Sequence, residues 1–158
     1  MRDAQGDLVV DQFAARGRVA FAQRTWPVDP GDLAVLRDEV RRWLDALGYR
    51  LDAVDDLVLA VNEAATNAME HAYVLPGPDD TVDIDFWVED DALSITIEDH
   101  GQWQTPGPAG GRGMGIPMMN HLVDTVTISH DASGTTVLLR QTLPEHSALR
   151  PAAAKQLR

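Results

Sequence analysis

The 158-residue sequence contains no cysteine, which excludes a disulfide framework and a thiolate metal site. It also lacks any apolar run that approaches the roughly 20 residues a helix needs to span a bilayer. The first residues, MRDAQGDLVVDQF, do not place an apolar stretch after a basic one, so they do not resemble a secretion signal. These absences favour a cytoplasmic protein that does not bind membranes.

Basic residues are also few, since 13 Lys and Arg stand against 25 Asp and Glu and give a net charge of −12. An acidic surface repels the phosphate backbone of nucleic acids and anionic lipids, so we expect no direct binding to either. Over most of the surface this charge serves solubility. A protein of this kind that binds an anion must supply backbone N–H groups or a local cation at the binding site.

The length and the hydrophobic content of 44% indicate one domain with a sizeable core. Residues 1–15 are polar and without periodicity, which predicts a flexible N-terminal arm. We place the folded domain at residues 16–143 and a C-terminal tail at residues 144–158.

The predicted elements follow the order strand, helix, helix, hairpin, loop, short helix, hairpin. Their ranges are 18–27 for the first strand, 29–49 for the helix that Gly48 ends, about 51–73 for the second helix, 81–88 and 92–99 for the first hairpin, 115–123 for the short helix, and 124–130 and 134–143 for the second hairpin. Strands joined by short turns favour a mixed, mostly antiparallel sheet, covered on one face by helices. The predicted fold class is therefore an α/β (α+β) sandwich of two layers, without the strand–helix–strand alternation of a Rossmann domain.

The second predicted helix carries a polar row, because Glu63, Asn67 and His71 recur at intervals of four residues opposite a broad apolar arc. Such rows are usually solvated faces. However, from Asp52 to Tyr73 no basic residue other than His71 is present to pair with the acids. A carboxylate can accept a proton, and a carboxamide one turn away can ligate a hard cation. The helix alone leaves both interpretations open.

A glycine-rich stretch follows the first hairpin. Asp99 stands at the end of a predicted strand, Gly101 follows it, and GGRGMG precedes the short helix. Glycines before a helix let backbone N–H groups approach an anion, and Arg112 adds a positive charge among them. A flexible surface loop that binds no anion would account for the same residues. The P-loop pattern is excluded, because no lysine stands here, and the Rossmann fingerprint requires a different order of elements.

Four motifs, taken in this order, resemble those of the GHKL (histidine-kinase-like, Bergerat-fold) ATPases. The N-box, the two glycine boxes and the closing threonine motif of that superfamily are similar to Glu63-x-x-x-Asn67-Ala68-x-x-His71-Ala72, Asp99-His100-Gly101, Gly111-Arg112-Gly113-Met114-Gly115 and Gly134-Thr135-Thr136. The small size, the NAMEHAY ending and the block GRGMGIPMMNHLVDTV resemble the bacterial anti-sigma-factor serine/threonine kinases in particular. The resemblance extends from about residue 18 to residue 143.

The resemblance implies roles for the residues of the helix and of the strand ends. Glu63 would be the general base, and Asn67 would ligate Mg²⁺ that bridges the phosphates of ATP. Asp99 would accept a hydrogen bond from the adenine amino group, Gly101 would allow close approach of the base, and Thr135 would help to seat it.

The second glycine box would form a lid that wraps the phosphates. Its members Gly111, Arg112, Gly113, Met114 and Gly115 are therefore implied nucleotide-binding residues, with Arg112 assigned as a hypothesis because its register varies among the relatives.

The implied activity is ATP-dependent phosphorylation of a Ser or Thr on an anti-anti-sigma partner, and the implied second function is sequestration of a sigma factor. The resemblance also implies a role in a stress response in the cytoplasm, and a homodimer. Trp103 departs from the pattern, because many relatives have glycine there, and the larger side chain would change how the first part of the lid closes. Two alternatives stay open. One is a non-catalytic partner-binding module with a degenerate nucleotide site, and the other is a fragment of a larger phosphatase or sensor regulator.

Overall fold

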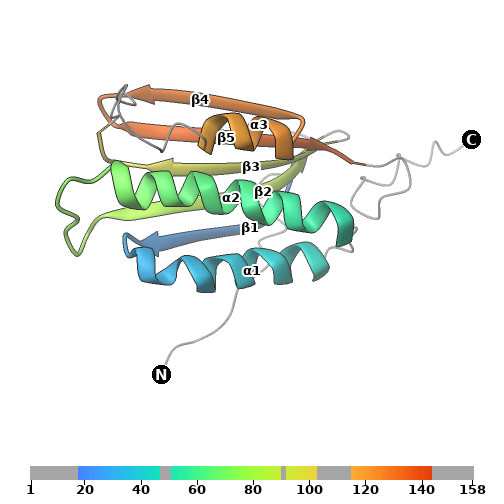
Figure 1. Cartoon of the computed structure of the whole chain (residues 1–158), viewed down its shortest axis with the longest axis horizontal. Coiled ribbons are helices and arrows are strands. Elements are labelled where there is room, and N and C mark those ends of the chain that lie inside the picture. The colour runs from blue at the N-terminus through green and yellow to red at the C-terminus, as the bar shows by residue number, and fades with distance from the viewer. Residues whose placement is uncertain (1–17, 47–50, 90–91, 103–114, 144–158) are drawn as a thin grey trace, which may run out of the picture.

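The computed structural model describes residues 18–46, 51–89, 92–102 and 115–143, and their helices and strands follow the predicted order (Figure 1). The elements are β1 (Arg18–Pro27), the 3₁₀ helix η2 (Pro30–Asp32), α1 (Leu33–Ala46), α2 (Leu51–His71), β2 (Thr81–Glu89), β3 (Ala92–Asp99), α3 (Gly115–Leu122), β4 (Thr125–Asp131) and β5 (Gly134–Thr142).

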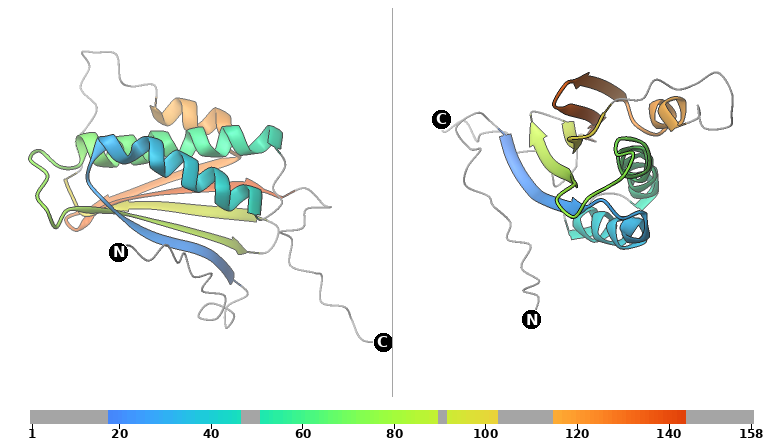
Figure 2. Two further views of the ribbon diagram at one scale, coloured as in Figure 1. Left: turned by 90° about the horizontal axis from the view of Figure 1, so that it is seen from below. Right: turned by 90° about the vertical axis from the view of Figure 1, so that its left-hand side faces the viewer.

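The strands form one sheet in the order β1-β2-β3-β5-β4, and all four pairings are antiparallel. The three α-helices cover one face of this sheet, as the views in Figure 2 show. The predicted two-layer α+β sandwich is therefore confirmed, with a sheet that is antiparallel throughout the described strands.

The core lies between the sheet and the helices, and it follows from the alternation in the sequence. Along β2, every second side chain from Val82 to Val88 is buried, while the residues between them are half-buried on the outer face. Trp43 of α1 meets Phe86 edge to face, with 5.2 Å between the ring centroids. Full burial of a large apolar side chain such as that of Phe86 contributes roughly 1.5–3 kcal/mol. The buried side chains of α1, α2 and the sheet form one cluster, which holds both helices on the sheet.

The ends of the two long helices differ from the prediction at two described positions. Asp29 caps η2 by accepting a 2.9 Å hydrogen bond from the Gly31 N–H, so the regular helix α1 begins only at Leu33. Helix α2 ends at His71, two residues before the predicted end. Pro76 has no N–H to offer the Ala72 carbonyl four residues earlier, and this carbonyl accepts a hydrogen bond from the Gln102 N–H at 2.8 Å.

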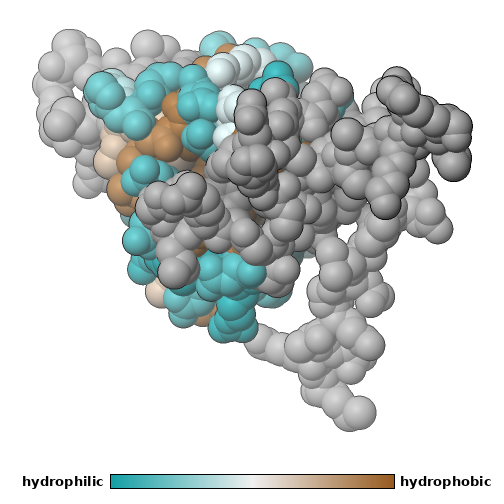
Figure 3. All heavy atoms as spheres, turned by 90° about the vertical axis from the view of Figure 1, so that its right-hand side faces the viewer, coloured by the Kyte–Doolittle hydropathy of each residue, from teal (hydrophilic) through white to brown (hydrophobic). Residues whose placement is uncertain are grey.

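Within the described residues, no helix has both the length and the hydropathy needed to cross a membrane. Figure 3 views the end of the molecule at which α2 begins, and hydrophilic side chains surround the hydrophobic ones seen there. Trp103, most of the second glycine box, the predicted arm and the predicted tail lie outside the described residues.

Candidate functional site

Helix α2 presents its polar row to the side away from α1. The α1 side of α2 is marked by two contacts, from Arg37 Nη1 to Asn62 Oδ1 at 3.0 Å and from Arg41 Nη1 to Asp55 Oδ1 at 2.6 Å. At about 100° per residue, the row from Glu63 through Asn67 to His71 lies roughly 100–180° around the helix from Asn62. Helix α3 packs on α2 from that opposite side (Figure 1).

The row is neither buried nor fully solvated, because Glu63, Asn67 and His71 are all half-buried. Their neighbours Ala64, Ala65, Ala68 and Met69 are buried against the sheet. The apolar arc predicted for this helix is therefore confirmed, and the polar row lies along its border.

Asp99 ends β3, and only 5% of its surface is exposed. Burial raises the pKa of its carboxyl above the usual value, while hydrogen bonds from the backbone N–H groups of Gly101 and Thr135 act in the opposite direction. The Gly101 N–H reaches Asp99 Oδ1 at 3.1 Å. The structure thus holds a largely desolvated acceptor in a fixed direction, which is what recognition of a ligand N–H group requires.

Gly101 lies directly against the end of α2. A Cβ at this position would stand 2.2 Å from the Ala72 carbonyl oxygen and 2.8 Å from the Ala72 Cβ. No side chain fits there without separating the strand end from the helix. Gly101 therefore couples the position of Asp99 to that of α2.

Replacing Gly101 by Ala is expected to lower the free energy of unfolding by about 1–3 kcal/mol, the usual cost of overpacking. Gly77→Ala is the matched control, because a Cβ there lies 3.7 Å from its nearest neighbour, Asp80 Oδ2, in ordinary contact. Urea denaturation followed by circular dichroism measures both changes. Equal stability of the two variants would contradict the close contact between Gly101 and Ala72.

Strand β5 begins beside Asp99 with a second close approach. Gly134 has a φ of 145°, and a Cβ there would lie 1.8 Å from the Asp99 carbonyl oxygen. Glycine is required here for two reasons. Other residues rarely adopt this φ, and any side chain would clash with the Asp99 carbonyl oxygen. The next residue, Thr135, is paired with Asp99 and is 6% exposed.

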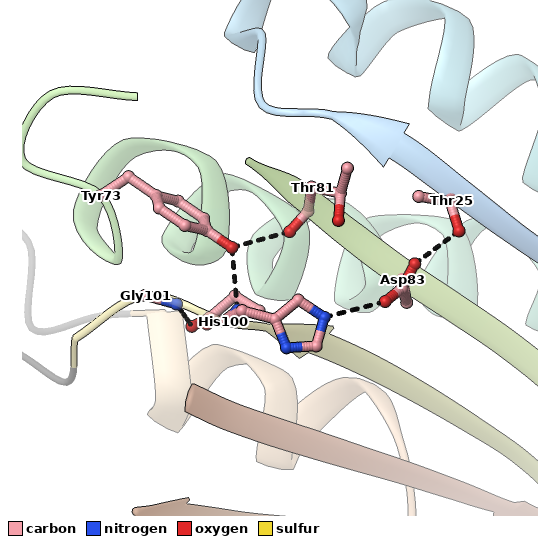
Figure 4. Close-up of polar contacts among 7 residues, drawn as sticks. Thr25, Tyr73, Thr81, Asp83, His100 and Gly101 are labelled. Carbon is pink, nitrogen blue, oxygen red and sulfur yellow. Dashed lines mark hydrogen bonds and ion pairs between the residues drawn. The ribbon is translucent and has the colours of Figure 1, made fainter. Parts of the chain in front are cut away.

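Sequence reasoning did not assign a second set of polar contacts, which joins the chain after α2 to the ends of β2 and β3 (Figure 4). The Tyr73 hydroxyl donates to the Thr81 carbonyl at 2.7 Å and accepts from the His100 N–H at 2.8 Å. On the outer face, His100 Nε2 lies 3.0 Å from Asp83 Oδ2, and the Thr25 hydroxyl donates to Asp83 Oδ1 at 2.6 Å.

The contact with Asp83 makes His100 pH-sensitive. That hydrogen bond is the main cause that raises the His100 pKa above 6.5, and the charges of Asp83, Glu98 and Asp99 add to it. The protonated form therefore stabilises the fold fully below about pH 6.5, and this contribution is lost as the pH rises through the raised pKa.

Replacing Asp83 by Asn should consequently destabilise the protein more at about pH 6 than at about pH 9. The expected difference is a few tenths up to about 1 kcal/mol, because both side chains are partly exposed. Unfolding free energies at the two pH values measure it, with Asp79→Asn in the exposed loop as the control. A penalty that does not change with pH would exclude a charged His100 as its source.

The structure brings some of the predicted site residues together. Asp99, Gly101 and Thr135 meet at one end of the sheet, where α2 also ends. Asn67 lies five residues before Ala72, about 7.5 Å along the helix axis. Gly115 begins α3, whereas the positions 111–114 lie outside the described residues.

The donor set of this region suits Mg²⁺ better than a transition metal. Among the described residues, no group of three His, Cys, Asp or Glu side chains could hold a metal ion. Mg²⁺ is commonly bound by one or two oxygen ligands of the protein, together with substrate phosphates and water. The Asn67 amide oxygen, one turn after the Glu63 carboxylate, fits that mode of binding.

The sequence is similar to known proteins over most of its length. The pattern of the family described as "Histidine kinase-like ATPase domain" matches residues 26–141. The chain is 30% identical over 133 residues to the serine-protein kinase RsbW of Bacillus licheniformis, and the match covers 74% of this chain and 82% of that one. RsbW of Bacillus subtilis matches with the same identity and coverage.

A solved structure shows the same fold. The crystal structure of the RsbU and RsbW domains of a Mycobacterium tuberculosis protein superposes with a TM-score of 0.63 at 25% sequence identity. The superposition covers 77% of this chain and 31% of that longer one. The chain therefore belongs to the histidine kinase-like ATPase family, to the branch that contains the RsbW proteins.

Proposed function

We propose that the chain is an ATP-dependent serine/threonine protein kinase and anti-sigma factor. One observation carries the proposal: the buried Asp99 carboxylate is held beside Gly101 and Thr135 at the end of the helix that bears Glu63 and Asn67. The names of the relatives, serine-protein kinases of the RsbW type, support the same assignment.

ATP would bind with its adenine at Asp99. The exocyclic amino group of the base would donate to the carboxylate, which faces little competition from water because Asp99 is buried. Gly101 and Thr135 would bound the space for the ring, and Gly111, Arg112, Gly113, Met114 and Gly115 would wrap the phosphates, as the family pattern implies.

Phosphoryl transfer requires positioning and charge neutralisation more than covalent chemistry. Glu63 would accept the proton from the hydroxyl of the partner's Ser or Thr. The amide oxygen of Asn67 would hold Mg²⁺, which when bound neutralises negative charge on the phosphate oxygens. Both side chains are half-buried on α2, so each keeps an exposed part for contact with a ligand.

The proposed substrate is an anti-anti-sigma protein, and the proposed second partner is a sigma factor. A phosphoryl group adds nearly two negative charges to the substrate at neutral pH. This chain already carries a net charge of −12, so the product would be repelled from its surface. Release of the phosphorylated partner would free the kinase to bind the sigma factor.

The decisive test incubates the purified chain with Mg²⁺, γ-labelled ATP and a cognate anti-anti-sigma protein. Transfer of label to a Ser or Thr of that protein is the expected result. Nucleotide binding without transfer would favour a non-catalytic binding module. Absence of both, measured by calorimetry and by labelling, would overturn the proposal.

A further inference from the structure

The pairing between β2 and β3 ends at a side chain, that of Tyr73. The register of these strands runs from Glu89 opposite Ala92 to Val82 opposite Asp99. In an uninterrupted ladder, the next pair would be Thr81 and His100. The Tyr73 hydroxyl lies there instead, bonded to the Thr81 carbonyl on one side and to the His100 N–H on the other (Figure 4).

The hydroxyl therefore acts as a spacer at the point where β3 leaves the sheet. It satisfies one carbonyl and one N–H that direct pairing would have joined, and it stands between them. Burial raises the pKa of Tyr73 above its usual value, so the hydroxyl keeps its proton at neutral pH and remains a donor to Thr81.

The segment beyond this point follows the residues that leave α2. The His100 N–H binds Tyr73, and two residues later the Gln102 N–H binds the Ala72 carbonyl at 2.8 Å. These two hydrogen bonds flank Gly101, which itself packs on Ala72. The direction in which the chain continues after Asp99 is thus fixed by two consecutive residues, Ala72 and Tyr73.

We infer that Tyr73 is a positioning residue for nucleotide recognition, whose hydroxyl sets the exit of β3 and thereby the placement of Asp99 and Gly101 against the base. This inference rests on the proposed binding of ATP at Asp99. The side-chain contact from His100 to Asp83 lies on the exposed outer face of the sheet, and it does not replace the hydroxyl between the strands.

Tyr73→Phe tests the inference, because it keeps the ring and removes only the oxygen atom. We expect the affinity for Mg-ATP to fall about tenfold, an effect of the size of one hydrogen bond. The affinity for Mg-GTP should change less, so the preference for ATP over GTP should narrow. The rate of transfer at saturating ATP should stay close to that of the unaltered protein, because Tyr73 would act on binding rather than on the reacting atoms.

Ile95→Val is the matched control, since it lowers the stability of the protein by a comparable amount. Ile95 lies in the buried centre of β3 and does not take part in the junction with Tyr73. It should leave the ratio of ATP to GTP affinity unchanged. Hydrogen exchange in the nucleotide-free protein gives an independent readout, because the amide of His100 should lose protection in Tyr73→Phe and keep it in Ile95→Val.

The outcomes separate the two claims. Unchanged ATP affinity and nucleotide preference in Tyr73→Phe, with ATP bound normally by the unaltered protein, would overturn the positioning role and leave the proposed function intact. Failure of the unaltered protein to bind ATP would overturn the proposed function and this role together. Unaltered protection of the His100 amide in Tyr73→Phe would overturn the junction itself.

Discussion

Replacing Glu63 by Gln is expected to slow phosphoryl transfer to the partner by about 10²- to 10⁴-fold, the usual contribution of a general base. Glutamine has the shape of glutamate but cannot take up the proton of the attacking hydroxyl. The affinity for Mg-ATP should remain nearly unchanged, because the proposed contacts with the base and the phosphates come from other residues. Single-turnover labelling of the partner, at saturating nucleotide, measures the chemical step directly.

Glu70→Gln is the matched control for this experiment. It makes the same chemical change on the same helix, one residue before His71, at a side chain that is exposed. Transfer by this variant should equal that of the unaltered protein. If Glu63→Gln also transfers at the normal rate, another group must accept the proton, and the role proposed for Glu63 is wrong.

Replacing Asp99 by Asn is expected to weaken Mg-ATP binding about 10- to 100-fold, since a hydrogen bond to a charged group contributes roughly 1.5–3 kcal/mol. Asparagine can keep Oδ1 for the Gly101 N–H. Its amide nitrogen would then meet the adenine amino group, donor against donor. Isothermal titration with ATP measures the loss.

The same change should stabilise the nucleotide-free protein. A carboxyl whose pKa is raised by burial favours the fold only below about pH 3.8, its ordinary value, and that contribution is lost as the pH rises through the raised pKa. At neutral pH the buried charge is therefore a cost, which the neutral amide removes. A higher melting temperature together with weaker ATP binding is the expected combination.

Asp85→Asn separates the two effects of the Asp99 substitution. Burial and the charges of Asp83 and Glu98 raise the pKa of Asp85 as well, but Asp85 lies on the outer face of β2. This variant should gain stability and bind ATP normally. Loss of ATP binding in both variants would show that removal of an acidic charge, rather than a contact with the base, governs affinity.

The fold could be predicted because short-range patterns in the sequence determine its helices and strands. The alternation from Val82 to Val88 requires a strand with one buried face, and the observed burial follows it residue by residue. The partner of the carbonyl at the end of α2 could not be predicted, because Ala72 accepts from Gln102, which stands far away in the sequence. Helical periodicity contains no record of such a partner.

The candidate site, like the fold, could be predicted only in part from the sequence. The spacing of Glu63 and Asn67 places them on one flank of a helix, but only the contact of Asn62 with α1 reveals that this flank lies away from α1. The acid Asp99 and the glycine Gly101 could be singled out by motif. The role of Tyr73 could not be predicted from its place in the NAMEHAY motif, because its position between two strand ends depends on their register.

The position of β1 at the edge of the sheet has a consequence for how the chain folds as it is synthesised. Its pairing partner β2 begins at Thr81, after both long helices have been made, whereas β2 and β3 are adjacent in the chain and so are β4 and β5. Closing so long a loop costs more chain entropy than closing a hairpin. The strand that leaves the ribosome first is therefore among the last to join the sheet, and until then the edge of β2 that it covers remains open to other chains.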